Sequence, residues 1–441
     1  MLTFAILGAL ALFLLHRSTV LPGVALVGLL SMYAIEQWAQ SQSLFFVQHG
    51  ALVNMMIAAI AAYALALRVY RRELWGEPYP LAAVLVILLY SYAALSTTWT
   101  SAFDWEVKAI WTKMWPILVI QLLIAPLLVA NAKDLTKIFS NQIFVGGLFC
   151  GLIVVMADYV GRKILFGEDG SASGNPLAVA QSGGITIICV VMMTRMFRWD
   201  MLVKLLVAGF CLVAIIKSGS RGQLFALAFA LIVAFPFTYS IKNPKIVVSS
   251  ALVAGLLVYG VVVGLDAFWG GTSGRYSTGA MTDAYSGRLD NVSRLVEAWL
   301  ANPVAIVFGL GNSASFDWNI VGFYPHMVPM EILCEEGLLG ASLYVWILMI
   351  VVRDALYVLR KKDLERSESA AFAILIGMIA YMFMLSFKQG SMLHWSSFFM
   401  AIMLFTRAVG VRRRLDQREA RESGASARTS TRRDYTIYAR S

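Results

Sequence analysis

Residues 371–388 read AFAILIGMIAYMFMLSFK, a predominantly apolar stretch in which only the last residue is charged. A helix of about 20 mostly apolar residues is long enough to cross the roughly 30 Å hydrocarbon core of a bilayer. Backbone polar groups find no water at that depth, so a crossing segment must pair its own N–H and C=O groups. Residues 371–388 are therefore predicted to form a transmembrane helix.

Comparable apolar stretches recur along the rest of the chain. They lie at 2–16, 18–34, 48–69, 80–99, 114–131, 138–157, 176–197, 201–217, 222–241, 245–265, 330–352 and 393–408. None alternates polar and apolar residues as a membrane β-strand does. The first two stretches are short, so they form either a hairpin or one span with an interfacial segment. Counting them as one span predicts an all-α polytopic integral membrane protein with about twelve transmembrane helices.

The composition agrees with a membrane protein. The chain has 441 residues, 59% of them apolar and 14% charged, with a mean hydropathy of +0.72. Soluble domains are about 45–50% apolar and about 25% charged, so a water-soluble enzyme is excluded. Four dispersed cysteines without a CxxC pair indicate neither a disulfide framework nor a zinc site. The net charge of +10 does not predict nucleic-acid binding, because the cations gather between the apolar stretches.

The distribution of Lys and Arg predicts the orientation. If the C-terminus is cytoplasmic, 26 of the 36 Lys and Arg residues lie on the cytoplasmic side, as the positive-inside rule requires. We then expect N-terminal transmembrane helices at 1–265, a large periplasmic loop with amphipathic helices at 266–329, and C-terminal transmembrane helices at 330–408. The basic tail 409–441 is expected to be disordered and to lie near anionic headgroups. Because ordinary connections are much shorter, the long loop is expected to be functional.

The remaining ten cations lie on the predicted outer side, and Arg221 is the first that suggests chemistry. It belongs to KSGSRG (217–222), a short turn between two apolar stretches. Glycines on both sides can expose backbone N–H groups, and a guanidinium donates several hydrogen bonds in a fork that matches phosphate oxygens. The turn is therefore a candidate anion site. The alternative is an arginine that reaches the headgroups without a specific partner.

Two SGR motifs in the long loop supply further candidates, Arg275 and Arg288. The second motif precedes an amphipathic pattern that predicts a helix. Its apolar positions are Val292, Leu295, Val296 and Trp299. An arginine near the N-terminus of that helix would add to the positive end of the helix dipole and favour an anion. Alternatively, either arginine forms a salt bridge with Asp283 or Asp290.

His326 is the single histidine of the long loop, directly before the next apolar stretch. A neutral imidazole can accept a proton near neutral pH, although an isolated histidine is more often structural. His394 lies beside Trp395, a pair that we interpret as part of an interfacial aromatic belt. Asp104 and Glu106 can hold a divalent cation in principle, but a solvated loop is the preferred interpretation.

Taken in order, these motifs resemble a known family. The Ser-Arg-Gly turn is followed by SGR at 286–288, Trp299, FGLGN at 308–312 and His326 ahead of EEGLLG at 335–340. This order resembles the O-antigen ligase and O-antigen polymerase superfamily, and is most like the ligase. The resemblance extends over most of 80–400. Its further landmarks are LSTTW at 95–99, NP at 175–176, Met330, Glu335 and Gly337, and its one departure is Met327 where the family has Asn.

The resemblance implies a membrane-embedded, metal-independent, inverting glycosyltransferase of C-type architecture that needs no cofactor. The donor would be a polysaccharide on undecaprenyl pyrophosphate, and the acceptor a sugar hydroxyl of lipid A-core at the periplasmic face of the bacterial inner membrane. His326 would be the general base, and Arg221 and Arg288 would hold the pyrophosphate; the spacing to Trp299 selects Arg288 over Arg275. Further contacts to the pyrophosphate are expected from Arg275, Lys217 and Lys388.

Other functions stay open at this point. An O-antigen polymerase or a protein O-oligosaccharyltransferase would use the same carrier and also attack with a hydroxyl. Outside this class, a transporter of lipid-linked anions would also need cations near the membrane. Transporters of that kind usually show pseudo-symmetric halves with broken spans, and the sequence shows no such halves.

Overall fold

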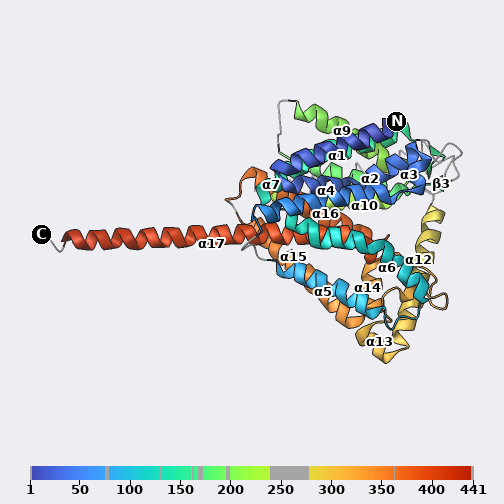
Figure 1. Cartoon of the computed structure of the whole chain (residues 1–441). Coiled ribbons are helices and arrows are strands. Elements are labelled where there is room, and N and C mark those ends of the chain that lie inside the picture. Colours follow the sequence, from blue (N-terminus) through green and yellow to red (C-terminus); the bar gives the residue numbers. More distant parts are fainter. Residues whose placement is uncertain are drawn as a thin grey trace.

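The computed structural model describes residues 2–74, 79–129, 131–157, 159–160, 163–166, 172–194, 199–238, 278–361 and 363–438, and most of these residues are helical (Figure 1). The exception is a small antiparallel sheet with the strand order β1-β2-β3. Its strands are Tyr159–Val160 (β1), Lys163–Phe166 (β2) and Ala172–Ser173 (β3). The helix-rich fold class expected from the sequence is confirmed, with this sheet as a minor departure.

The first half of the chain contains the sheet and thirteen helical segments, including η1, η2 and η3, among the described residues. They are α1 (Leu2–Val20), η1 (Pro22–Val24), α2 (Ala25–Gln42), α3 (Leu44–Gln48), α4 (Ala51–Tyr70), α5 (Leu81–Ser96), α6 (Asp104–Leu118), η2 (Val119–Ile124), η3 (Ala125–Leu128), α7 (Ala132–Met156), α8 (Pro176–Met192), α9 (Asp200–Lys217) and α10 (Arg221–Thr238). The segment η2 is a π-helix that follows Pro116 and precedes Pro126. Proline removes a backbone donor and crowds the preceding turn, so α-helical pairing is interrupted there.

The second half builds the part of the molecule that surrounds His326. Its helices are α12 (Thr278–Leu300), α13 (Pro303–Phe308), η4 (Ala314–Phe316), α14 (Val328–Glu335), α15 (Gly337–Arg360), α16 (Arg366–Ser386), η5 (Leu393–Trp395) and α17 (Ser396–Tyr438). Most residues of α16 are buried, as expected for a helix that is apolar on all sides. It packs against α7, α8, α10 and α17 and so forms the centre of the helical body.

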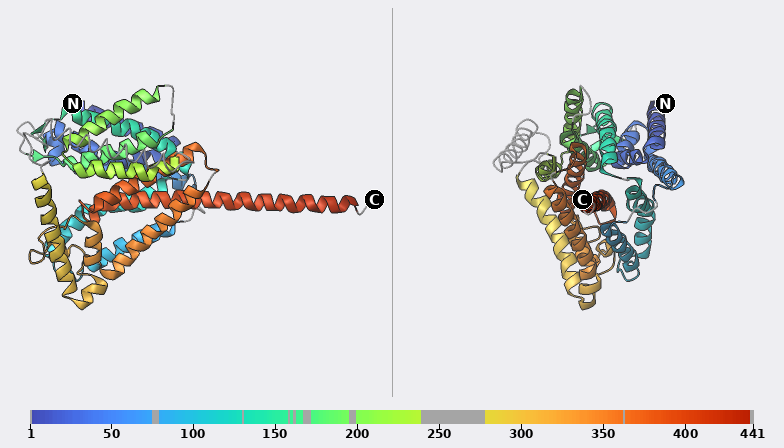
Figure 2. Two further views of the ribbon diagram at one scale, coloured as in Figure 1. Left: turned by 180° about the vertical axis from the view of Figure 1, so that it is seen from behind. Right: turned by 90° about the vertical axis from the view of Figure 1, so that its left-hand side faces the viewer.

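The helices gather in two groups that meet at α17. Helices α1, α2, α4, α7, α8, α9, α10 and α16 form one group, and α5, α12, α13, α14 and α15 form the other (Figures 1 and 2). Helix α17 packs against α16 of the first group and against α5 and α15 of the second. The connection between α16 and α17, residues 387–395, therefore lies where the two groups meet.

Seven helices among the described residues are long and apolar enough to cross a membrane, and α5 and α8 are shorter apolar helices. The chain is thus a multi-pass membrane protein. The stretches 2–16 and 18–34, which the preferred count merged, are the separate helices α1 and α2 joined by η1. The expected span at 245–265 lies outside the described residues, so the total of twelve stays a prediction.

The C-terminal tail differs from the expected disordered arm, because α17 continues as one helix from Ser396 to Tyr438. Arginine and alanine are frequent in this tail, and both favour helices. An i,i+4 ion pair between Arg412 and Asp416, 3.0 Å long, also supports the helix where it leaves the body. The figures show the rest of α17 extending away from the other helices (Figures 1 and 2).

Candidate functional site

Arg221 is the first residue of α10, and a tight turn after α9 sets its position. Helix α9 ends at Lys217, and Gly219 then adopts a left-handed backbone with φ of 64°. The N–H of Ser220 donates to the Ser218 hydroxyl at 3.3 Å. A glycine is suited to this turn because its lack of a Cβ permits positive φ. The half-buried Arg221 therefore begins its helix at a defined point on the α9–α10 turn.

Lys388 lies directly beside this turn. A Cβ added to Gly222 would stand 2.3 Å from the Nζ atom of Lys388, so the lysine side chain occupies the space that a larger residue would need. The neighbouring Gln223 donates to Gln389 at 3.4 Å and accepts from the hydroxyl of Tyr381. These bonds fix the start of α10 against the end of α16. They bring the two cations, Arg221 and Lys388, to one place.

Lys217 is held on the other side of the turn. Its Nζ atom donates to the carbonyl of Val154 at 3.3 Å, near the C-terminal end of α7. A cation at a helix C-terminus is favourable because the last carbonyls carry partial negative charge. One hydrogen bond of the Lys217 ammonium group is therefore made to α7.

Arg288 lies in the middle of α12 rather than at a helix start. Helix α12 begins at Thr278, ten residues before Arg288. The expectation that a helix N-terminus adds to an anion site at Arg288 is therefore wrong. The arginine is half-buried, whereas Gly287 and Leu289 are exposed, so it faces the protein. The alternative candidate Arg275 lies outside the described residues.

His326 lies close enough to Arg288 for their charges to interact. Partial burial of the ring, and second the positive charge of Arg288, lower the pKa of His326 below its ordinary value. Its backbone is left-handed, with φ of 61°, a conformation that few residues other than glycine adopt. Tyr324 contacts the imidazole edge-on with ring centroids 4.3 Å apart. The ring is thus held in place and is neutral near pH 7.

The connection 387–395 begins beside the α9–α10 turn and ends near His326. Lys388 is at its start, and at its end His394 accepts or donates a bond of 2.8 Å with the Ser391 hydroxyl. The ring of His394 stacks on Tyr324 at 6.4 Å between centroids, and Tyr324 in turn contacts His326. The connection therefore runs along the chain from the turn that holds Arg221 to the aromatic contacts of His326.

The expected interfacial pair divides in the structure, because His394 is exposed whereas Trp395 is buried. Trp395 is only 4% exposed, and its ring fills the space beside Gly390. Sequence reasoning missed this histidine as a neighbour of His326, because the two lie 68 positions apart and only the fold brings them together.

Buried carboxylates hold the segment that precedes His326. Glu335, 1% exposed, accepts the backbone N–H groups of Ser313 at 2.7 Å and Ser315 at 2.9 Å. Glu336 accepts from the Ser96 hydroxyl and the Asn312 side-chain amide, both at 2.9 Å. Buried charges need such donors, because an unpaired one is costly. The FGLGN and LSTTW landmarks thus form a scaffold around the acidic pair of EEGLLG.

A third acidic residue, Glu331, ties α14 to the connection. Its Oε1 atom accepts the backbone N–H of Met392 at 3.0 Å. The Met392 carbonyl accepts from the hydroxyl of Tyr90 on α5 at 2.8 Å. The connection is therefore anchored from two helices of the second group as well as by Gln223 of the first.

Asp104 and Glu106 do not gather further carboxylates. Asp104 is 90% exposed and faces Lys108 on its own helix at 4.0 Å. Within the part of the chain that the structure describes, no three His, Cys, Asp or Glu side chains lie together as potential metal ligands. The pair lies at the first turn of α6, where negative charge favours the helix N-terminus.

Fold and site together define a multi-pass membrane protein in which Lys388 lies beside the α9–α10 turn and Arg288 lies near the imidazole of His326. Residues 205–345 match the family model described as O-antigen ligase, and this match supports a relationship to the O-antigen ligase superfamily. The match confirms the resemblance drawn from the motifs, and it includes Arg221, Arg288 and His326. The activity that the family indicates is glycosyl transfer of the ligase or polymerase type. No curated protein matches the chain.

Proposed function

We propose that this protein transfers an O-antigen polysaccharide from undecaprenyl pyrophosphate to a sugar hydroxyl of lipid A-core. The reaction takes place at the periplasmic face of the inner membrane and uses no metal ion. The observation that carries the proposal is that the family match contains Arg221, Arg288 and His326. Two contacts support it further: Arg288 and His326 lie close enough for their charges to interact, and Lys388 lies beside the turn that holds Arg221.

In the proposed reaction, the cations stabilise the pyrophosphate leaving group. The bond between the anomeric carbon and the pyrophosphate oxygen breaks, and its electron pair stays on the pyrophosphate. Arg221 and Arg288 donate to the phosphate oxygens and stabilise the charge that develops there. Lys388 beside Gly222 adds a point charge, and Lys217 and Arg275 are weaker candidates for the same task. With several cations in place, the leaving group needs no acid.

In the same reaction, His326 removes the proton of the acceptor hydroxyl. The acceptor hydroxyl attacks the anomeric carbon from the side opposite the pyrophosphate, which inverts the configuration. Its proton passes to the neutral imidazole of His326. The depressed pKa of His326 keeps the ring unprotonated at neutral pH, so the base is available before the donor binds. His326 is also only half-buried, so part of the residue is exposed to solvent.

The decisive experiment uses purified protein in liposomes with both lipid substrates, and the product is analysed by mass. A polysaccharide joined to lipid A-core supports the ligase. Glycan lengthened on a second carrier lipid, or attached to protein, assigns the chain to one of the sister activities instead. Chelation by EDTA should leave the rate unchanged, and loss of activity that added Mg²⁺ restores would contradict the metal-free reaction.

A further inference from the structure

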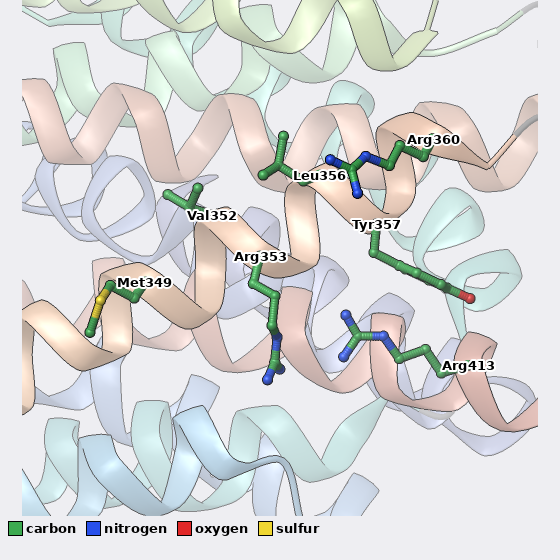
Figure 3. Close-up of a pocket in the computed structure, with 7 residues that line it drawn as sticks. All are labelled: Met349, Val352, Arg353, Leu356, Tyr357, Arg360 and Arg413. Atoms are coloured by element: carbon green, nitrogen blue, oxygen red, sulfur yellow. The ribbon is translucent and has the colours of Figure 1, made fainter.

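A hollow in the described part of the chain lies far from His326, at the other end of α15. Its volume is about 540 Å³, and Figure 3 shows its lining. The lining residues are Met349, Val352, Arg353, Leu356, Tyr357, Arg360 and Arg413. Helix α15 begins at Gly337 beside the acidic pair and ends at Arg360, and 24 helical residues span about 36 Å. The hollow is therefore separate from the candidate glycosyl-transfer site.

The hollow has an apolar part and a basic part. Met349, Val352 and Leu356 lie along one face of α15 and are 58%, 58% and 44% exposed, as expected for side chains that meet acyl chains. The basic part is formed by Arg353 and Arg360 on α15 and by Arg413, which reaches across from α17 (Figure 3). The apolar strip thus leads to three guanidinium groups at the end of the span.

The basic part carries excess positive charge. Arg353 and Arg413 both donate to the same carboxylate oxygen of Asp354, each at 2.9 Å. One carboxylate therefore serves two guanidinium groups, and the lining keeps a net positive charge once Arg360 is included. Asp354 is only 4% exposed, so an incoming anion meets the arginines rather than the carboxylate.

The arginine from α17 is held in place before any ligand arrives. Its guanidinium lies over the ring of Tyr357 at 4.5 Å from the centroid. The Tyr357 hydroxyl donates to Asp416, which also pairs with Lys361 at 3.0 Å. A guanidinium fixed by stacking and by a hydrogen bond loses little freedom when it binds a phosphate.

We propose that this hollow binds one anionic phospholipid, with its phosphate on Arg353, Arg360 and Arg413 and an acyl chain along Met349, Val352 and Leu356. A phosphatidylglycerol-type lipid, with a net negative headgroup, matches the net charge of the lining. A zwitterionic headgroup would bring a cation toward the arginines. The apolar strip selects a lipid over free phosphate, because only a lipid covers these exposed side chains.

The test is lipid binding to the delipidated full-length protein, measured by native mass spectrometry. The ligands are phosphatidylglycerol, phosphatidylcholine and inorganic phosphate. We expect at least tenfold tighter binding of phosphatidylglycerol than of phosphatidylcholine. The double variant R353Q/R360Q should lose about tenfold of that affinity, the equivalent of one charge-assisted hydrogen bond. Asp354 keeps its partner Arg413 in this variant, so the local fold is retained.

The matched control is R418Q/R421Q, which removes the same charge from exposed positions on α17 outside the hollow. It should bind phosphatidylglycerol as the unaltered protein does. Equal affinity for the two phospholipids, or an equal loss in the control, overturns the proposal. Inorganic phosphate that displaces the lipid at comparable concentration also overturns it, because the site would then recognise a free anion. Glycosyl transfer is not measured, so failure here is independent of the proposed reaction.

Discussion

His326 combines three features at one residue: a left-handed backbone, a half-buried ring and a nearby guanidinium. Replacing it by alanine removes the proposed general base but leaves Arg221 and Arg288 to bind the donor. General base catalysis contributes about 10²- to 10⁴-fold, so we expect H326A to lower the transfer rate by that range. Donor binding, measured by titration with the carrier-linked glycan, should persist. The control H49A alters a histidine of the first helix group, and full transfer by H326A would contradict the assignment.

The pH dependence of transfer follows from the lowered pKa of the same residue. Only the neutral imidazole accepts a proton, so kcat/KM should fall as the pH drops through the pKa of His326. Partial burial and then Arg288 lower that pKa, so the acidic limb should lie below the usual histidine value of about 6.5. Removing the guanidinium in R288Q should move the limb to higher pH, whatever its effect on the maximal rate. A limb that stays at the same pH in R288Q would contradict the electrostatic contact.

The variant R221K tests whether the proposed pyrophosphate site requires a guanidinium group or only a positive charge. In R221K the positive charge remains, but the planar fork that binds two phosphate oxygens is lost. The loss of one hydrogen bond to a charged group costs about 1.5–3 kcal/mol, which corresponds to about 10- to 150-fold in kcat/KM. R294K, at an exposed arginine of α12, is the matched control. Steady-state rates in liposomes measure the effect, and unchanged kinetics in R221K would show that charge alone is sufficient.

At the scale of elements, the joint between α14 and α15 depends on a glycine. Gly337 has φ of 67°, and a Cβ there would lie 2.4 Å from both the Val307 carbonyl oxygen and the Gly309 nitrogen. G337A should therefore lower stability by about 2 kcal/mol or more, from backbone strain and the clash with backbone atoms. Its thermal unfolding temperature should fall.

Gly287 provides the matched comparison for that change. It lies within α12, and a Cβ there would meet nothing within 4 Å. Because alanine favours helices over glycine, G287A should leave stability unchanged or raise it by up to about 1 kcal/mol. Equal unfolding temperatures for the two variants would show that the α14–α15 joint tolerates a side chain.

Individual elements show how far the sequence could predict the fold. The stretch 371–388 corresponds to α16, because a run of apolar residues in a bilayer has few alternatives to a helix. The start of α12 was misplaced, because Ser-Gly before Arg288 resembles a helix boundary. A single glycine inside a helix costs only about 1 kcal/mol, and packing offsets it.

The candidate site was predictable only in part, because its contacts join residues that lie far apart in the sequence. Motif order pointed to His326, and its electrostatic contact with Arg288 is present in the fold. The partners of the acidic pair could not be inferred, since Ser96 and Glu336 lie 240 positions apart. Spacing along a chain predicts faces of one helix, whereas contacts between distant helices depend on packing that no local pattern records.

On the scale of the whole molecule, α17 joins the two helix groups, and its last part extends beyond them. The described ion pairs of this helix end at Asp416. Truncation after Glu422 should therefore leave the unfolding temperature and the transfer rate unchanged. Truncation after Gly410 removes Arg412 and Arg413, which pair with Glu368 and Asp354, and should lower the unfolding temperature. Equal stability of the two truncated chains would show that these pairs contribute little.

The connection 387–395 contacts both parts of the candidate site, which makes carrier binding and proton removal difficult to study separately. Lys388 at one end of this segment touches the α9–α10 turn, and His394 at the other end shares Tyr324 with the proposed base. Under the proposed mechanism, a substitution that shifts this segment would change carrier affinity and proton removal together, so a single altered rate constant would be ambiguous. The two roles are better separated by substitutions outside this segment. Variants on α10 would test carrier binding, and variants on α12 or in the residues before α14 would test proton removal.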